Sequence, residues 1–119
     1  MIDHFNLPVS NLSHSSKFYQ SILNHLNVHL LFQDSDAIGF GKEIWQFGIV
    51  LEPNPITSMH VAFVASTHAQ VEDFFLGALA AGGIDNGKPE FRIEYEPCYY
   101  STYIIAPDGH NIEAVCRTP

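Results

Sequence analysis

The sequence predicts an α+β fold built from two βαβββ modules. Two observations predict this fold. The order of strand and helix patterns is the same in both halves of the chain, and the halves align without a gap after a shift of 56 residues, which places His4 on His60. Because one such unit cannot close its own core, two units are expected to pack together.

The first half opens with a strand at residues 2–9, where apolar and polar side chains alternate. Phe5 and Leu7 lie on the apolar face of this strand, whereas His4 and Asn6 lie on the other face. The second face is therefore the one on which we expect chemistry.

A helix of roughly four turns follows, because apolar residues recur at three- and four-residue steps after an N-cap at Ser10 or Asn11. Short apolar runs separated by turn residues then predict three strands, at residues 28–32, 37–40 and 44–51. The first half thus reads as strand, helix and three strands.

The pattern begins again after the breaker Pro53-Asn54-Pro55. A strand is expected at 58–65, and a helix at 71–79 is opened by a capping box from Thr67 to Gln70 and closed by Gly82-Gly83. Three further strands are expected at 92–95, 99–105 and 111–116. We therefore interpret residues 1–119 as one domain with modules 1–55 and 56–119.

Composition excludes several classes of partner. Five basic residues against thirteen acidic ones give a formal charge of −8, so neither a nucleic acid nor an anionic membrane is an expected partner. The N-terminus lacks a signal-peptide pattern, and no apolar run is long enough to span a membrane. Cys98 and Cys116 form no CxxC motif, so we expect free thiols in a cytoplasmic protein.

The last strand carries an acid among apolar residues. A run of β-forming residues stops at Ala-Pro-Asp-Gly, and the strand that follows places Glu113 on one face with Asn111 and Val115. One interpretation is an edge strand whose acid lies in water. The other is a functional carboxylate. His110, within the turn, is expected to have only a local hydrogen-bonding role.

Five stretches of the chain resemble the vicinal oxygen chelate superfamily, which includes glyoxalase I, bleomycin-binding proteins and extradiol dioxygenases. They are Asp3-His4, Ser16-Lys17-Phe18-Tyr19, His60-Val61-Ala62-Phe63, Ala80-Ala81-Gly82-Gly83 and Pro107-Asp108-Gly109-His110-Asn111-Ile112-Glu113. The resemblance implies that the paired βαβββ modules form an open, cup-shaped mixed sheet with helices on its outside. It also implies a divalent metal at the centre of the cup, with His4, His60 and Glu113 as its ligands. Two imidazoles and one carboxylate leave open positions on the metal for a substrate with two neighbouring oxygens.

The resemblance implies a metal-dependent lyase, isomerase or dioxygenase that uses Fe, Mn, Ni or Zn and works as a homodimer on a small-molecule substrate. Glyoxalase I takes a further glutamate from the last strand of its first half. Here Glu52 lies one residue off that position, and a shift of one residue turns a side chain to the opposite face. Glu52 is therefore not an expected ligand unless a bulge intervenes.

The remaining candidates lie around Glu113 in the sequence. We expect Tyr99 and Tyr103 to orient or protonate a substrate oxygen. The expected substrate-binding residues are Asn6, Arg92, Tyr95 and Tyr100. Two other interpretations stay open: a metal-independent protein that sequesters a small molecule as bleomycin-resistance proteins do, and a dimerisation scaffold in which the three ligand-type residues are relics.

Overall fold

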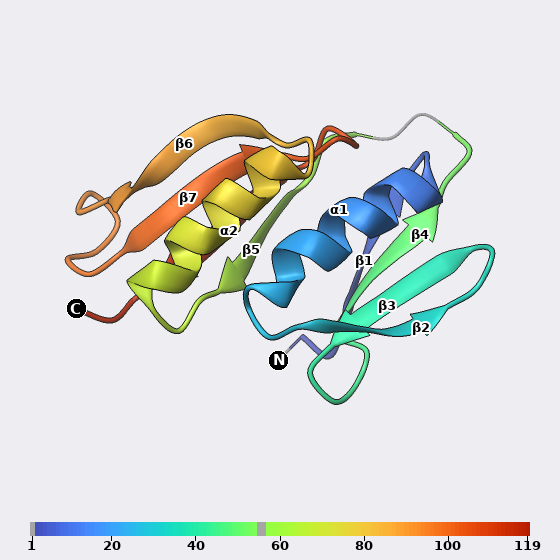
Figure 1. Cartoon of the computed structure of the whole chain (residues 1–119), viewed down its shortest axis with the longest axis horizontal. Coiled ribbons are helices and arrows are strands. Elements are labelled where there is room, and N and C mark those ends of the chain that lie inside the picture. The colour runs from blue at the N-terminus through green and yellow to red at the C-terminus, as the bar shows by residue number, and fades with distance from the viewer. Residues whose placement is uncertain (1, 55–56) are drawn as a thin grey trace.

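The computed structural model describes residues 2–54 and 57–119, and it confirms that strand, helix and three strands occur twice (Figure 1). The first module comprises β1 (Phe5–Val9), α1 (Leu12–Asn24), β2 (His29–Gln33), β3 (Ala37–Gly41) and β4 (Phe47–Leu51). The second comprises β5 (His60–Val64), α2 (His68–Ala80), β6 (Ile84–Phe91), β7 (Tyr100–Ile105) and β8 (Asn111–Cys116). The expected module boundary at residues 55 and 56 lies outside the described residues.

Each module contributes one four-stranded mixed sheet. The strand orders are β1-β4-β3-β2 and β5-β8-β7-β6, and only β1 with β4 and β5 with β8 pair in parallel. Neither sheet closes on itself, as expected for an open cup. Figure 1 shows both helices on one side of the two sheets. Each sheet therefore has a helix-covered face and a helix-free face.

The two helices begin at equivalent positions of the repeat. Asn11 caps α1 by accepting a hydrogen bond from the His14 N–H at 3.0 Å, and Thr67 caps α2 by accepting one from the Gln70 N–H at 3.1 Å. The Gln70 side chain accepts from the N–H of Ser66 rather than from that of Thr67, so the predicted capping box is shifted by one residue.

One predicted strand is wrong. Residues 92–95 form a turn, in which the Tyr95 N–H donates to the Arg92 carbonyl at 3.0 Å, and the strand lies earlier, at β6. The segment of β6 contains Gly87 and Pro89, which strands disfavour, but it pairs with β7, with irregularities in the register on both sides of Gly87. Pairing with a neighbouring strand therefore overrides a weak local preference.

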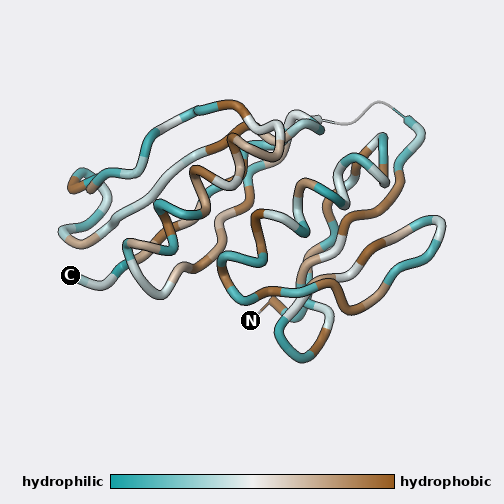
Figure 2. Tube along the Cα trace, viewed as in Figure 1, coloured by the Kyte–Doolittle hydropathy of each residue, from teal (hydrophilic) through white to brown (hydrophobic). Residues whose placement is uncertain are grey.

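Figure 2 colours the chain by hydropathy, from hydrophilic to hydrophobic segments.

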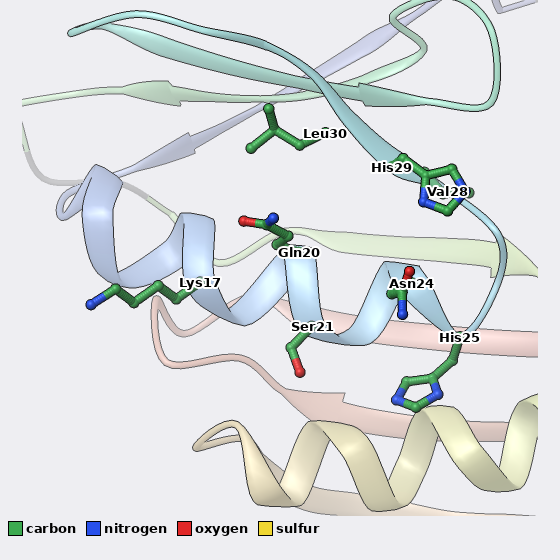
Figure 3. Close-up of a pocket in the computed structure, with 8 residues that line it drawn as sticks. All are labelled: Lys17, Gln20, Ser21, Asn24, His25, Val28, His29 and Leu30. Atoms are coloured by element: carbon green, nitrogen blue, oxygen red, sulfur yellow. The ribbon is translucent and has the colours of Figure 1, made fainter.

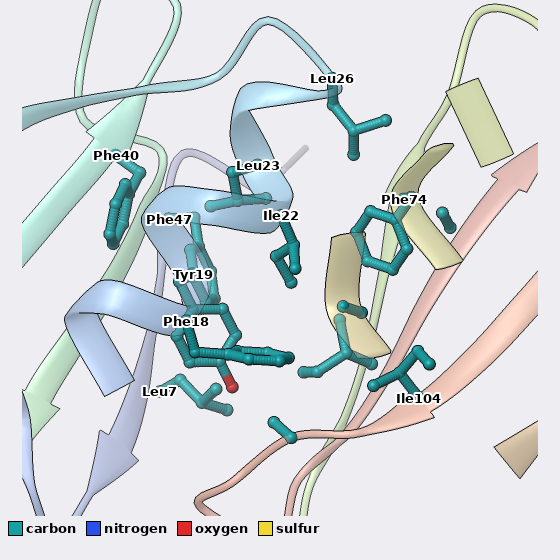
Figure 4. Close-up of a cluster of buried hydrophobic side chains, with 14 of the residues drawn as sticks. Leu7, Phe18, Tyr19, Ile22, Leu23, Leu26, Phe40, Phe47, Phe74 and Ile104 are labelled. Atoms are coloured by element: carbon teal, nitrogen blue, oxygen red, sulfur yellow. The ribbon is translucent and has the colours of Figure 1, made fainter. Parts of the chain in front are cut away.

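The helix-covered faces of both sheets share one hydrophobic core. Phe18 of α1 and its repeat equivalent Phe74 of α2 are both buried, and burial of each ring contributes about 2–3 kcal/mol (Figure 4). Across the modules, the rings of Phe47 and Phe63 meet edge to face at 5.0 Å. The modules thus pack on each other within one chain.

The turn before β8 joins the two modules. Asp108 accepts hydrogen bonds from the Tyr19 hydroxyl at 2.9 Å and the Ser15 hydroxyl at 3.3 Å, both on α1. His110 is fully buried, and its Nδ1 accepts from the Met59 N–H at 2.9 Å while its Nε2 donates to the Pro8 carbonyl at 2.7 Å. His110 therefore bonds to residues far away in the sequence, and the expectation that it has only a local role is wrong.

No helix among the described residues is long and apolar enough to cross a membrane.

Candidate functional site on the helix-free faces

Glu113 is a buried acid in the middle of a sheet. Its strand, β8, lies between β5 and β7, where Glu113 is opposite Ala62 on one side and Tyr103 on the other. Glu113 is only 2% exposed to solvent. The edge-strand interpretation is therefore wrong, and the carboxylate must be stabilised by partners within the protein.

Two side chains hold the Glu113 carboxylate. Oε1 lies 3.0 Å from Nε2 of His60, and Oε2 accepts a hydrogen bond from the Tyr99 hydroxyl at 2.5 Å. No lysine or arginine among the described residues forms an ion pair with Glu113. His60 and Tyr99 are therefore the side chains that contact this carboxylate directly.

The orientation of the His60 ring is fixed by the backbone. Its Nδ1 lies 3.2 Å from the Asn111 carbonyl, which can only accept, so Nδ1 carries a proton. Nε2 then faces Oε1 of Glu113 at 3.0 Å. Metal-ligating histidines commonly donate their other ring N–H to a backbone carbonyl, as His60 does with Nδ1, so Nε2 is the nitrogen that could bind a metal.

The tyrosines next to Glu113 are hydrogen-bond donors at neutral pH. Burial, followed by the hydrogen bond to Glu113, raises the pKa of Tyr99 above its ordinary value. Burial and then the charge of Glu113 raise the pKa of Tyr103. Tyr95 packs edge to face against Tyr99, with 5.2 Å between ring centroids. The structure thus brings Tyr95, Tyr99 and Tyr103 together around the acid.

Arg92 and Tyr100 differ in their relation to this cluster. The Arg92 guanidinium lies 4.8 Å above the Tyr103 ring and donates to the Ser101 hydroxyl, the Glu90 carboxylate and the Lys88 carbonyl. Most of its donors are therefore used within the protein. Tyr100 lies away from the cluster, because its hydroxyl donates to Glu72 of α2 at 2.8 Å.

His4 and Asn6 lie on the other module. The His4 Nδ1 is 2.8 Å from the Asp3 carboxylate, and a cavity of about 250 Å³ is lined by His4, Asn6 and Trp45. Within residues 2–54 and 57–119, no group of three His, Cys, Asp or Glu side chains is placed to hold a metal. The structure thus pairs His60 with Glu113 but does not bring His4 to them within one chain.

The strand register identifies the equivalent of Glu113 in the first module. Glu113 is opposite Ala62, whose repeat equivalent is Asn6, and Asn6 is opposite Gly48. The equivalent position is therefore a glycine. Glu52 follows β4, and its carboxylate accepts from the Asn54 N–H, so it does not substitute for the missing acid.

Trp45 covers this glycine and was not singled out by sequence reasoning. Its indole lies over Gly39 and Gly48, where an added Cβ would meet ring atoms at 2.5 and 2.6 Å. The sequence signal was a single tryptophan between strands that each carry a glycine. Its position on the sheet becomes visible only when the loop between β3 and β4 is folded.

Larger cavities lie elsewhere. One of about 790 Å³ runs between α1 and β2 (Figure 3) and is lined by Lys17, Gln20, Ser21, Asn24, His25, Val28, His29 and Leu30. Another, of about 380 Å³, lies between the modules beside Phe47 and Phe63. Neither contains His4, His60 or Glu113.

The paired βαβββ modules with a histidine and a buried carboxylate on the helix-free face define a glyoxalase-like fold. A glyoxalase/bleomycin resistance protein from Albidiferax ferrireducens T118 superposes with a TM-score of 0.88 at 26% identity, covering 97% of this chain and 98% of that one. No family model and no curated protein matches the sequence.

Two further solved structures share the fold. A glyoxalase/bleomycin resistance protein/dioxygenase family enzyme from Burkholderia phytofirmans PsJN has a TM-score of 0.76 at 15% identity, covering 98% of each chain. A glyoxalase-related enzyme from Fulvimarina pelagi has a TM-score of 0.77 at 20% identity, covering 98% of this chain and 87% of that one. The chain thus has the fold of glyoxalase/bleomycin resistance/dioxygenase proteins, which supports its resemblance to the vicinal oxygen chelate superfamily.

Proposed function

We propose that the protein is a metal-dependent enzyme of the glyoxalase-like kind, acting on a small molecule that carries two neighbouring oxygens. His4, His60 and Glu113 are the proposed ligands of a divalent Fe, Mn, Ni or Zn ion. The observation that carries the proposal is the paired geometry of His60 and Glu113.

The donor atoms of that pair fit one metal ion. Nitrogen and oxygen ligands lie about 2.0–2.2 Å from Zn²⁺, so two neighbouring ligands of one ion are roughly 3–3.5 Å apart. The His60 Nε2 and the Glu113 Oε1 are 3.0 Å apart. His4 offers the same type of donor, because Asp3 engages its Nδ1 and leaves Nε2 available.

The neighbouring side chains have defined tasks in this proposal. A bound divalent ion would act as a Lewis acid on the oxygens of the substrate. Tyr99 holds Oε2 of Glu113 and thereby leaves Oε1 as the ligand atom. Tyr103, kept protonated by its raised pKa, is the proposed proton donor to a substrate oxygen. Arg92 fixes the Tyr103 ring from above.

One observation favours a second candidate, a metal-independent binding protein. Both oxygens of Glu113 already have partners within the chain, so the site is satisfied without an ion. In this alternative the helix-free faces take up a small molecule and carry out no reaction on it.

Metal titration separates the two candidates. Chelator-treated protein is titrated calorimetrically with Mn²⁺, Fe²⁺, Ni²⁺ and Zn²⁺, beside the variants His60→Ala and Glu113→Gln. The matched control is His29→Ala, since His29 is exposed on β2 and lines a different cavity. We expect stoichiometric binding that both site variants abolish and the control retains. Absence of binding, or binding unaffected by His60→Ala, would favour the binding protein.

The family resemblance also supports a cytoplasmic homodimer as part of the proposal. Exposed apolar side chains on the second module, such as Val64, which is 80% exposed, support burial against a second copy. A monomer in light scattering at micromolar concentration would contradict it.

A further inference from the structure

Trp45 lies where the first module has no acid. The loop between β3 and β4 folds back so that the indole ring covers Gly39 and Gly48 on the helix-free face, and Phe32 stacks beside it at 5.2 Å. A side chain at either glycine would occupy the same space as the ring. The two glycines therefore make room for Trp45.

The indole N–H has no partner. Among the described residues, Trp45 Nε1 is the only buried side-chain nitrogen or oxygen atom without a hydrogen bond. Buried tryptophan N–H groups normally find an acceptor, because an unpaired one loses its hydration without compensation. This donor belongs to a residue that lines the cavity of about 250 Å³ shared with His4 and Asn6.

The repeat relates this donor to the proposed metal site. A Cβ at Gly48, the equivalent of Glu113, would lie 2.3 Å from Asn6 Oδ1 and 2.6 Å from Trp45 Nε1. An amide and an unpaired N–H thus stand where the second module has its carboxylate. The carboxylate of the second module, which only accepts hydrogen bonds when ionised, thus corresponds to an amide oxygen with an indole N–H donor beside it.

We propose that Trp45 is a specificity-determining residue whose indole N–H donates a hydrogen bond to a carbonyl oxygen of the substrate. This inference rests on the proposed function and names the substrate class as a small, neutral, single-ring hydroxyketone. An apolar cavity of 150 Å³ holds benzene, so about 250 Å³ admits one ring with oxygen substituents.

The surrounding charge favours a neutral ligand over an anion. The chain carries a formal charge of −8, and the ionisable neighbour on this side, His4, is already paired with Asp3. Asn6 and the indole are uncharged. Apart from the proposed metal ion, a free carboxylate would meet no permanent positive charge among the residues that line this cavity, whereas a carbonyl oxygen needs only a donor.

The single tryptophan makes the test direct, because the indole gives one ¹H–¹⁵N resonance. Labelled full-length protein is titrated with maltol, a neutral ring with adjacent carbonyl and hydroxyl oxygens, and separately with o-cresol, which lacks the carbonyl. Each titration is run in EDTA and again with Zn²⁺. We expect maltol, and not o-cresol, to move the indole proton downfield. Trp45→Phe should weaken maltol binding about tenfold, the effect of one neutral hydrogen bond.

Each result decides the proposal. An indole resonance that maltol leaves unmoved in both conditions, an equal shift with o-cresol, or unchanged affinity in Trp45→Phe would overturn it. The wild-type titration stands even if the variant fails to fold. Metal binding with an unmoved indole rejects this inference alone, whereas an indole shift in a protein that binds no metal rejects only the metal-dependent function.

Discussion

His110 and Pro8, 102 residues apart in the chain, are joined by a hydrogen bond of 2.7 Å from the imidazole Nε2 to the backbone carbonyl. The same ring accepts from the Met59 N–H, so one buried side chain connects the start of β8, the segment before β5 and the strand β1. The two modules are thus joined by specific polar contacts in addition to their shared core.

His110→Ala is expected to lower the free energy of unfolding by about 2–4 kcal/mol, because it leaves the Met59 N–H and the Pro8 carbonyl without partners in a buried place. Urea unfolding measures the change. His14→Ala is the control, since His14 is exposed on α1 and its variant should stay within about 0.5 kcal/mol of the wild type. Equal stabilities of the two variants would show that the contact is dispensable.

The raised pKa of the buried Tyr19 hydroxyl predicts that the protein loses stability at alkaline pH. Burial, followed by the charge of Asp108, raises its pKa above the ordinary value near 10. Above that pH the unfolded chain releases the Tyr19 proton while the folded protein keeps it, so unfolding becomes more favourable as pH rises. Below pH 10 this contribution is fully present.

Tyr19→Phe should therefore lose about 1 kcal/mol at pH 7, for the missing hydrogen bond, and show a shallower decline between pH 10 and 11. Unfolding by urea at a series of pH values measures both effects. Tyr99, Tyr100 and Tyr103 also have raised pKa values, so a residual decline remains in the variant. Parallel curves for variant and wild type would be the contradicting result.

Gly39→Ala is expected to displace the indole of Trp45, because the new Cβ would lie 2.5 Å from its ring. The displaced ring becomes exposed to water, so tryptophan emission should move to longer wavelength, and stability should fall by about 1–3 kcal/mol. In a Trp45→Ala background the same substitution should cost far less. A full cost in that background would mean that another contact forbids the alanine.

Mixed dimers test where the ligands come from. Chains carrying His4→Ala are unfolded and refolded together with chains carrying His60→Ala, and metal binding is measured. Because one chain does not bring His4 to His60 and Glu113 in its described part, we expect sites composed from two chains. Random pairing then restores about a quarter of the wild-type sites. No recovery, with normal binding by the wild type, would place all ligands on one chain.

Local sequence signals were enough to predict the order of the elements. Asn11 and Thr67 are strong N-cap residues in front of apolar helical patterns, and both cap a helix in the structure. Strand β6 was missed because Gly87 and Pro89 weaken its pattern, while its stability depends on pairing with β7. The local sequence pattern does not show which distant strand a segment will pair with.

The site was predictable only in part. Alternation along β8 put Glu113 on the same face as Asn111, and the repeat singled out His4 and His60. The sequence did not reveal that Tyr100 points to α2, or that Trp45 folds onto Gly48, because both depend on side-chain directions and loop paths. Equivalence in a repeat also says nothing about whether two equivalent residues meet.

Because Gly48 stands in the first half at the position equivalent to Glu113 in the second, the two halves of the duplicated chain differ in the groups they bring to the site. Under the proposed function, the second half supplies the acid that binds the metal. The first half, which has no acid at the equivalent position, determines substrate specificity. The choice depends on a short connecting loop between β3 and β4. A protein engineer could then vary residues 42–46 to retarget the binding preference while leaving the chemistry untouched.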